Sequence, residues 1–393
     1  MKKVWILILV TLVIAAAMSV DAISWIFNLT GAANLFREPP VSAYAGFVDL
    51  DLIDLNDRDQ KVYAPRVSDQ DFHAGAGVLI YANDPLFEEK VDLLLNYLIY
   101  LHVNSINLSF PIFQDDWRSS RVYIDDELTL SEDNIRYFIR EANKRDFTVM
   151  IRPILDEASL YLDDQWRGSI EPEDKESWFE SYTEVILKYS QIAAEEEADI
   201  FCVGTEFSSL EAETDLWLNL IEDVRSLYDG QLTYAVNWDR VSNGNIEFWE
   251  ELDFIGMDAF FPLDAPQEAT IEELVEAWQP WVETIADIKL LYDMPVVLTE
   301  VGVVSQVGSH QFPWRWTDND QADLETIDLK AQSNYYAATC EALCETVSGI
   351  YWWNFELTPP DNPDNDLSFN PTGKPAADVI RHIFENKQKR SED

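Results

Sequence analysis

The sequence predicts an α/β fold in which a single (β/α)8 barrel, the TIM-barrel architecture, occupies residues 71–386. Short apolar runs bounded by Gly, Pro or Asn alternate with longer segments of helical period along this range. The runs are apolar throughout, which is typical of parallel strands covered on both faces. Eight such units over about 320 residues match a barrel with long loops. An open, doubly wound sheet is the alternative, but no Gly-rich phosphate-binding turn follows an early strand.

Each predicted strand is one of the apolar runs, and most of the intervals between them hold an amphipathic helix. In chain order, the predicted strands cover residues 75–82, 105–110, 148–154, 200–205, 232–237, 254–261, 296–299 and 349–354. The predicted helices cover residues 88–101, 131–145, 175–197, 210–228, 271–291, 329–346 and 375–384. Between the fifth and sixth strands, around residues 246–252, the pattern leaves room only for a stub.

The N-terminus has the pattern of a targeting segment. Lys2 and Lys3 precede an apolar run, and Val20-Asp21-Ala22 resembles a small-x-small cleavage site. Residues 1–22 are therefore predicted to be a signal peptide or an uncleaved membrane anchor, with residues 23–70 as an N-terminal extension or linker. The last seven residues, 387–393, are predicted to be a charged tail. We expect the protein to be secreted or extracytoplasmic, free or held by its N-terminal segment.

The charge balance is strongly acidic, with 73 Asp and Glu against 27 Lys and Arg and a formal charge of −46. Such a field disfavours nucleic acid and anionic membranes as partners, so membrane contact is expected only through the N-terminal segment. The acidic residues are spread along the whole chain and predict a solvated acidic surface. This pattern favours a halophilic protein, with an ordinary acidic secreted protein as the alternative.

Cysteine and histidine usage predicts neither a disulfide framework nor a metal site. Cys340 and Cys344 are four residues apart in a predicted helix, which is poor disulfide geometry, so these two and Cys202 are predicted to be free. The four histidines have no metal-binding spacing, and no cofactor is expected: they are His73, His102, His310 and His382.

Two predicted strands of similar design each end in a glutamate. Glu206 follows the run "FCVGT" and Glu300 follows "VVLT". In a barrel of this kind the residues at the C-terminal ends of the strands line one mouth, so the two carboxylates are expected to point into the same site. Strand alternation predicts that each shares its face with residues two and four positions earlier, Cys202, Gly204, Val296 and Leu298.

Two carboxylates in one cleft are suited to glycoside hydrolysis. One, kept protonated by burial and by its neighbour's charge, donates a proton to the leaving oxygen, and the other attacks the anomeric carbon. A separation of about 5–5.5 Å leads to retained configuration, and a wider gap admits water and leads to inversion. A rim salt bridge or cap is the alternative explanation for either glutamate alone.

The motifs "FCVGTEF" and "VVLTEVG" resemble those of the retaining glycoside hydrolases of clan A. The stretches "QWRGSIEPEDKESWFESYTEVILKYSQIA", "LTYAVNW", "DFIGMDAFFPL", "GIYWWNFEL" and "NPTGKPAADVI" resemble glycoside hydrolase family 113, known as β-mannanases. The resemblance covers about residues 74–385 and implies Glu206 as acid/base and Glu300 as nucleophile. Thr205 stands where clan A usually has Asn, and Phe260-Phe261 stand where a Tyr commonly holds the nucleophile.

Sugars present hydroxyl groups to polar side chains and flat C–H faces to aromatic rings, and both kinds of side chain follow the predicted strands. The substrate-binding candidates are Trp117, Arg152, Trp166, Arg167, Asn237, Trp238, Asp258 and Trp353. Trp314, Trp316 and Trp352 belong to the same group of tryptophans near strand ends. Arg152 is also a candidate partner that keeps a catalytic carboxylate ionised, and for the others packing or rim contacts are the alternative.

The function predicted from these patterns is an exported enzyme that cleaves internal β-1,4-mannosidic bonds of a polysaccharide. A retaining β-glycosidase acting on another β-linked glycan is one alternative. A carbohydrate-binding barrel that has lost catalysis is the other, favoured only by the departures at Thr205 and Phe260. No obligate protein partner is implied.

The acidic excess predicts that salt stabilises the folded protein. At about 1 M salt the Debye length falls to about 3 Å, which screens the repulsion among surface carboxylates. The melting temperature and the solubility, measured at fixed pH from dilute buffer to molar KCl, should therefore both rise. A melting temperature that does not respond to salt would count against the halophilic interpretation.

Overall fold

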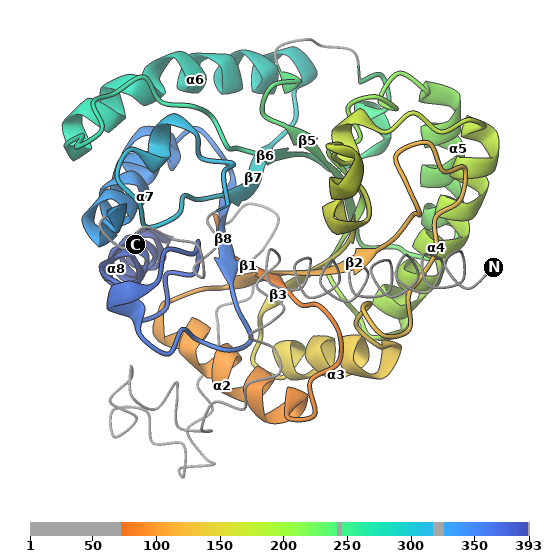
Figure 1. The fold of residues 1–393 in the computed structure, drawn as a ribbon, viewed down its shortest axis with the longest axis horizontal. Helices are drawn as coiled ribbons and strands as arrows, with labels where there is room; N and C mark the ends of the chain where they lie inside the picture. The colour runs from red at the N-terminus through yellow and green to blue at the C-terminus, as the bar shows by residue number, and fades with distance from the viewer. Residues whose placement is uncertain (1–71, 242–245, 317–325, 392–393) are drawn as a thin grey trace, which may run out of the picture.

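The computed structural model describes residues 72–241, 246–316 and 326–391. The predicted targeting segment, residues 1–22, and the predicted extension, residues 23–70, lie outside this description. Eight parallel strands close into a barrel in chain order, each paired with its neighbours in sequence, and the last strand pairs with the first. The helices form a ring around the strands (Figure 1). The predicted (β/α)8 fold is confirmed.

The strands lie close to the predicted runs. They are β1 His73–Leu79, β2 Ser105–Ile112, β3 Thr148–Leu155, β4 Ile200–Thr205, β5 Gln231–Asn237, β6 Phe254–Asp258, β7 Val296–Val301 and β8 Gly349–Phe355. The helices are α2 Phe87–Tyr100, α3 Glu132–Asn143, α4 Lys175–Glu195, α5 Thr214–Arg225, α6 Ile271–Tyr292, α7 Leu329–Leu343 and α8 Pro375–Ser391. The predicted stub between β5 and β6 contains a 3₁₀ turn, Trp249–Glu251.

Several helices begin at a polar cap that satisfies otherwise unpaired backbone N–H groups. The Ser131 hydroxyl accepts a hydrogen bond from the N–H of Asn134, at 3.3 Å, and starts α3. Thr270 and Glu273 form a capping box that starts α6. Such caps typically stabilise a helix by about 1 kcal/mol, and they set where each helix leaves its loop.

The barrel interior is filled with side chains and is not a pore. A compact cluster inside it comprises Met150, Ile200, Cys202, Ala235, Phe254, Val297 and Tyr351. At one end, His73 Nδ1 and the Tyr351 hydroxyl lie 3.0 Å apart in a hydrogen bond. A much larger apolar cluster lies between the strands and the helices. Small polar side chains, among them Asn107, Ser109 and Thr233, are also buried in the strands, and the charged groups described below lie toward the strand ends, where the loops begin.

The end of β4 departs from strict alternation. Cys202 faces the interior as predicted, but a Cβ on Gly204 would lie 2.8 Å from the ring of Trp217 in the helix layer, so Gly204 faces outward. The pairing register between β4 and β5 shifts between Cys202 and Thr205. The prediction that Gly204 shares a face with Glu206 is wrong, because this irregularity rotates the strand end.

The end of β7 is irregular in the same way. Val297 packs inside the barrel, whereas Val296 and Leu298 belong to the outer cluster. The prediction that these two share a face with Glu300 is therefore wrong. The register shifts between Leu298 and Val301, and this shift allows Glu300 to turn inward.

Two predictions about the C-terminal part of the chain are also corrected. Cys340 and Cys344 form a disulfide instead of remaining free. Helix α7 ends at Leu343, and the Cα atoms of the two cysteines, 4.7 Å apart, lie within disulfide reach. Cys202 is free and buried, as predicted. Helix α8 continues to Ser391, so the segment predicted as a tail is helical over most of its length.

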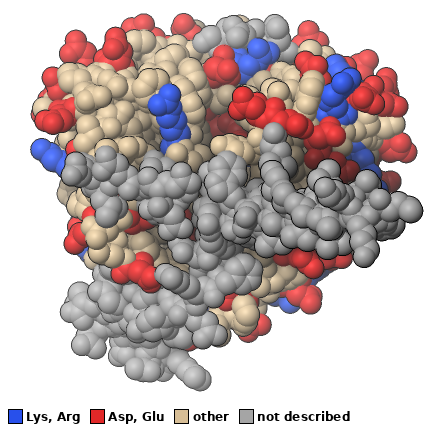
Figure 2. Space-filling view, in the orientation of Figure 1, with Lys and Arg blue, Asp and Glu red and all other residues tan. Residues whose placement is uncertain are grey.

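On the face shown in Figure 2, acidic side chains are spread over the described surface and outnumber the basic ones. Within the described ranges, no helix is both long and apolar enough to cross a bilayer. In the same ranges, no three His, Cys, Asp or Glu side chains cluster in a way that could hold a metal ion.

Candidate active site

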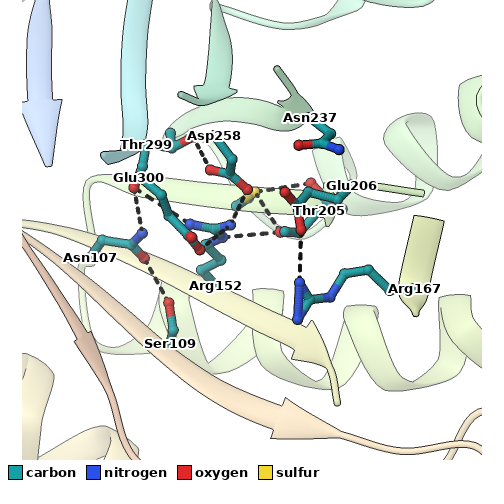
Figure 3. Close-up of polar contacts among 12 residues, drawn as sticks. Asn107, Ser109, Arg152, Arg167, Thr205, Glu206, Asn237, Asp258, Thr299 and Glu300 are labelled. Carbon is teal, nitrogen blue, oxygen red and sulfur yellow. Dashed lines mark hydrogen bonds and ion pairs between the residues drawn. The ribbon is translucent and has the colours of Figure 1, made fainter. Parts of the chain in front are cut away.

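A fully buried arginine lies at the centre of the polar groups at the strand ends. Arg152, on β3, has no exposed side-chain surface. Its Nη2 lies 2.6 Å from Asp258 Oδ2 and 2.7 Å from Glu300 Oε1, and its Nε donates to the Thr205 hydroxyl at 3.0 Å. Figure 3 shows Arg152 among these three side chains. One guanidinium therefore joins the ends of β3, β4, β6 and β7.

Asp258 is the carboxylate most completely enclosed. It ends β6, is fully buried, and accepts a second hydrogen bond from the Thr299 hydroxyl at 2.8 Å. The carbonyl of Thr299 accepts in turn from the Asn107 side-chain amide at 3.4 Å. Asp258 was predicted as a substrate-binding candidate, and that role stays a prediction. Its position indicates a role in holding Arg152.

The second glutamate has an arginine of its own. Arg167, from the loop after β3, places Nη1 2.8 Å from Glu206 Oε2, and its Nε donates to the carbonyl of Leu155 at 3.0 Å. The same Nη1 lies 3.1 Å from Glu157 Oε1, whose side chain is 43% exposed. Arg167 therefore forms ion pairs with both a buried carboxylate, Glu206, and a half-exposed one, Glu157.

Glu206 is held in an unusual backbone conformation. Its φ is +55°, in the left-handed region that L-residues rarely adopt. Its N–H donates to the carbonyl of Ala235 at 2.8 Å, and the next N–H, of Phe207, donates to the Tyr234 hydroxyl at 2.9 Å. Both partners belong to β5. Strain of this kind costs about 1–3 kcal/mol and persists only where neighbouring contacts fix it, as they do here.

Burial makes all three carboxyls harder to ionise than they are in water. It raises the pKa of Glu206 to about 7, with a further rise from the charge of Asp258, while Arg167 opposes both. Burial raises the pKa of Glu300 well above its usual value; Arg152 lowers it, and Asp258 and Glu206 raise it. Burial also raises the pKa of Asp258, against the effects of Arg152 and Thr299. The neighbouring charge that acts most on Glu206 is that of Asp258.

The number of charges limits the protonation state of this cluster. Fully ionised, Glu206, Asp258 and Glu300 carry one more unit of charge than Arg152 and Arg167 can neutralise, and Arg167 also pairs with Glu157. A proton shared among the three buried carboxyls reduces this excess of negative charge, which is favoured in a site removed from water. With one proton bound, two of the three carboxyls remain ionised.

The loops that follow β7 and β8 are tied together beside Glu300. A Cβ on Gly302 would lie 2.3 Å from the carbonyl oxygen of Trp353, so only glycine allows the two chains to approach this closely. The buried amine of Lys374 donates to the Ser305 hydroxyl at 2.9 Å and pairs with Asp366 at 2.7 Å. These contacts fix the strand end that carries Trp353 relative to the strand end that carries Glu300.

Trp353 belongs to an apolar cluster at the strand ends that we call the Trp353 cluster. Its buried members are Ile154, Phe260, Val304, Trp353 and Phe369, and Trp238 packs against it. Trp353 is 4% exposed. Phe260, which stands where the clan commonly has a Tyr near the nucleophile, packs here and offers Glu300 no hydrogen bond. The ion pair described for Glu300 is with Arg152.

The remaining candidates are placed less centrally. Asn237 bonds within its own loop: its side-chain amide donates to Asp239 at 3.1 Å, and its oxygen accepts from the N–H of Trp238 at 2.9 Å. Trp117 packs against the outer core. Trp166 lies over Gly168, where a Cβ would approach its ring to 2.3 Å. For these residues the structure shows local packing and rim contacts.

Trp352 was grouped with the tryptophans expected near the site, and the structure places it elsewhere. It lies within β8, is fully buried, and stacks on Tyr336 of α7 with ring centroids 4.3 Å apart. Its neighbour Trp353 points to the opposite side of the strand, as alternation requires. Trp352 therefore stabilises the contact between the strand and the helix layer and does not reach the site.

Several groups at the site, Thr299 and Glu157 among them, were not predicted from the sequence. Thr299 immediately precedes Glu300, so its position next to a candidate was a usable signal, but alternation assigned it to the opposite face. Glu157 lies two residues beyond β3, and nothing in the sequence pairs it with Arg167. Asp156, next to it, is 3% exposed; burial raises its pKa to about 6, although its hydrogen bond from the Ala158 N–H lowers it.

A parallel eight-stranded barrel with two buried glutamates and their arginine partners at the strand ends is the arrangement expected of a glycoside hydrolase. The sequence profile of glycoside hydrolase family 113 matches residues 85–374, most of the chain. The chain belongs to glycoside hydrolase family 113.

Solved structures share this fold. A family 113 β-1,4-mannanase is 23% identical, with a TM-score of 0.70 over 80% of this chain and 99% of that chain. The family 113 β-mannanase from Alicyclobacillus acidocaldarius gives the same identity and TM-score over 81% of this chain and 99% of that chain. A family 5 mannosidase from Rhizomucor miehei is 10% identical, with a TM-score of 0.53 over 84% and 99%. A search of curated protein sequences finds no match.

Removing the guanidinium charge of Arg152 should destabilise the fold. In Arg152→Met, Asp258 and Glu300 lose their buried partner, which typically lowers the free energy of unfolding by about 3–5 kcal/mol. Urea unfolding at pH 7 measures the loss. The loss should shrink as pH falls, because protonation removes the unpaired charges.

The control is Lys188→Met, which breaks a half-exposed ion pair with Glu132 and should cost about 0–1 kcal/mol. Equal losses in both variants would contradict this account.

Proposed function

We propose that the protein is a retaining endo-β-1,4-mannanase in which Glu206 is the acid/base and Glu300 the nucleophile. The observation that carries the proposal is the pair of buried glutamates at the ends of β4 and β7, each held by a different arginine. Membership of family 113 supports the reaction class. The mannanases among the solved structures of the same fold support the choice of a mannan-type substrate.

In the first step, a carboxylate oxygen of Glu300 attacks the anomeric carbon as the bond from that carbon to the leaving oxygen breaks. The leaving oxygen takes the proton from Glu206. A carboxyl with a pKa of about 7 is suited to this transfer, because it holds the proton near neutral pH and still releases it readily. Burial raises the pKa of Glu300, and Arg152, 2.7 Å away, opposes that rise; the attack requires the state in which the shared proton is on Glu206 and Glu300 is ionised.

In the second step, Glu206 is ionised and removes a proton from water. The water oxygen attacks the same anomeric carbon, and the bond to Glu300 breaks with two inversions giving net retention. Arg167 favours the ionised form of Glu206 at this stage, while its contact with Glu157 limits how far it lowers the pKa beforehand. The shared arginine thus allows one carboxyl to act first as an acid and then as a base.

We also propose that the enzyme acts outside the cytoplasm and in a salty medium. The basic and apolar N-terminal residues support export, and the formal charge of −46 supports adaptation to salt. A polysaccharide too large to enter a cell is the substrate class that such an enzyme meets.

The two glutamates should be separable by the choice of substrate. Glu300→Ala should abolish turnover of both mannan and an aryl β-mannoside, because no glycosyl-enzyme forms, and azide should restore some activity with an inverted product. Glu206→Ala should lower kcat/KM on mannan by about 10²–10⁴. It should spare the first step on an aryl glycoside with a good leaving group, which needs no proton. Its residual cleavage of mannan should lose the fall in activity that wild-type cleavage shows as pH rises through about 7.

Reducing-end assays on mannan, glucomannan, xylan and cellulose define the substrate in the same experiment. Equal losses on both substrate types for Glu206→Ala would contradict its role as the acid. Full activity in both variants would place the catalytic pair elsewhere, with Asp258 as the first replacement to test. Wild-type cleavage of xylan or cellulose in preference to mannan would contradict the substrate assignment.

A further inference from the structure

The last residue of β3 and the two that follow it lie around Arg167, the arginine that contacts Glu206. The carbonyl of Leu155 accepts from Arg167 Nε at 3.0 Å, and Glu157 Oε1 lies 3.1 Å from Arg167 Nη1. The same Nη1 lies 2.8 Å from Glu206 Oε2, a contact that Figure 3 shows. Between Leu155 and Glu157 comes Asp156, a buried carboxyl that the proposed mechanism does not use.

Asp156 fixes the start of the 3₁₀ turn Glu157–Ser159. Its Oδ1 accepts a hydrogen bond from the N–H of Ala158 at 2.6 Å, as the side chain of a helix N-cap does. Its own N–H donates to the carbonyl of Ile112, the last residue of β2, at 2.9 Å, and its carbonyl accepts from the Ser159 hydroxyl at 2.8 Å. The turn is therefore tied to the barrel at Asp156, and this contact sets where the next residue, Glu157, lies.

A tyrosine from another loop holds the Asp156 side chain. Tyr81, in the connection that follows β1, donates a hydrogen bond from its hydroxyl to the Asp156 carboxylate. Burial raises the pKa of Asp156 to about 6; the Ala158 N–H and Arg167 lower it, and Glu157 raises it. At neutral pH Asp156 is therefore mostly ionised, and hydrogen bonds to an ionised carboxylate are stronger than those to a neutral group.

The position of Glu157 bears directly on Glu206. Both carboxylates approach the same nitrogen of Arg167, so the attraction that Arg167 offers to Glu206 depends on how closely Glu157 is held. Beyond the effect of burial, Asp258 and Glu157 raise the pKa of Glu206, and Arg167 lowers it. The Glu157 side chain is 43% exposed and can exchange this contact for water, which makes the anchoring of its backbone important.

We propose that Asp156 is a positioning residue for the acid/base: by capping its turn it holds Glu157 against Arg167, and so limits how strongly Arg167 stabilises the ionised form of Glu206. This inference rests on the proposed function, in which Glu206 keeps its proton near neutral pH until the leaving oxygen takes it. When the turn loosens, Arg167 acts more fully on Glu206 and lowers its pKa. The enzyme then loses activity first on the alkaline side.

The test measures kcat/KM on mannan as a function of pH in Asp156→Ala. Wild-type activity falls as Glu206 loses its proton, at a pH of about 7. In Asp156→Ala the same fall should occur about half a unit to one unit lower, which is a loss of about three- to tenfold above pH 8 and a much smaller change below pH 6. Asp156→Asn should recover most of the shift, because its amide oxygen still accepts from the Ala158 N–H.

A double-mutant cycle tests whether Asp156 acts through Glu157. Glu157→Gln removes the competing charge directly and should move the fall in the same direction. The double variant Asp156→Ala/Glu157→Gln should move it no further than Glu157→Gln alone, because the two changes remove one interaction. Tyr81→Phe keeps the cap and loses one of its supports, so it should give a smaller shift in the same direction. This variant also tests the inference if Asp156→Ala does not fold.

Asp174→Ala is the matched control, because Asp174 caps α4 in the same way, accepting from the Ser177 N–H at 3.1 Å. It should lower the melting temperature and leave the pH profile in place. A wild-type profile in both Asp156→Ala and Tyr81→Phe would overturn the inference. Additive shifts in the double variant would overturn it too, and so would a uniform loss at every pH, which would mean that Asp156 supports the fold alone. The proposed function survives these results and fails if wild-type protein cleaves no mannan at any pH.

Discussion

Arg152 brings a full positive charge into a barrel whose interior is packed with apolar and small polar side chains, and the ends of four strands are arranged around it. Asp258 and Glu300 can be buried there because this guanidinium lies within 2.7 Å of both. Its Nε donates to the Thr205 hydroxyl on a third strand, and its Nη1 donates to the carbonyl of Thr299 at 3.5 Å. A buried ion pair adds little net stability, since desolvation offsets the attraction, but loss of one partner is costly. The interaction therefore fixes geometry more than it stabilises the fold.

A second arginine extends this arrangement to Glu206. Arg167 comes from a loop, and its partner Glu157 is half exposed, so the acid/base proposed here lies in a more adjustable environment than Glu300. This difference suits the proposed roles, since a nucleophile needs a fixed charge and an acid/base must change its charge twice in each cycle. The left-handed backbone of Glu206 and the register shifts of β4 and β7 show that both strand ends are shaped locally to present these side chains.

Sequence patterns predicted the barrel and its strands because their physical causes are local: apolar runs, helical periods and turn residues. They also predicted Glu206, Glu300 and Arg152, which follow from reading polar residues at strand ends. Gly204 and Leu298 were assigned to the wrong face because alternation assumes a regular strand, and a register shift depends on pairing with neighbours. The Cys340–Cys344 disulfide was missed because it depends on where α7 ends. The contact of Arg167 with Glu157 depends on a loop conformation that no period encodes.

The covalent intermediate is the most direct test of the account. An activated 2-deoxy-2-fluoro β-mannoside should slow both steps through its electron-withdrawing fluorine and leave the enzyme trapped as a glycosyl ester. Intact-protein mass spectrometry should then show one added glycosyl group, and peptide mapping should locate it on Glu300. A label on Glu206 or Asp258 would contradict the assignment of the nucleophile. Release of product of inverted configuration, with no label on the protein, would contradict the double-displacement mechanism.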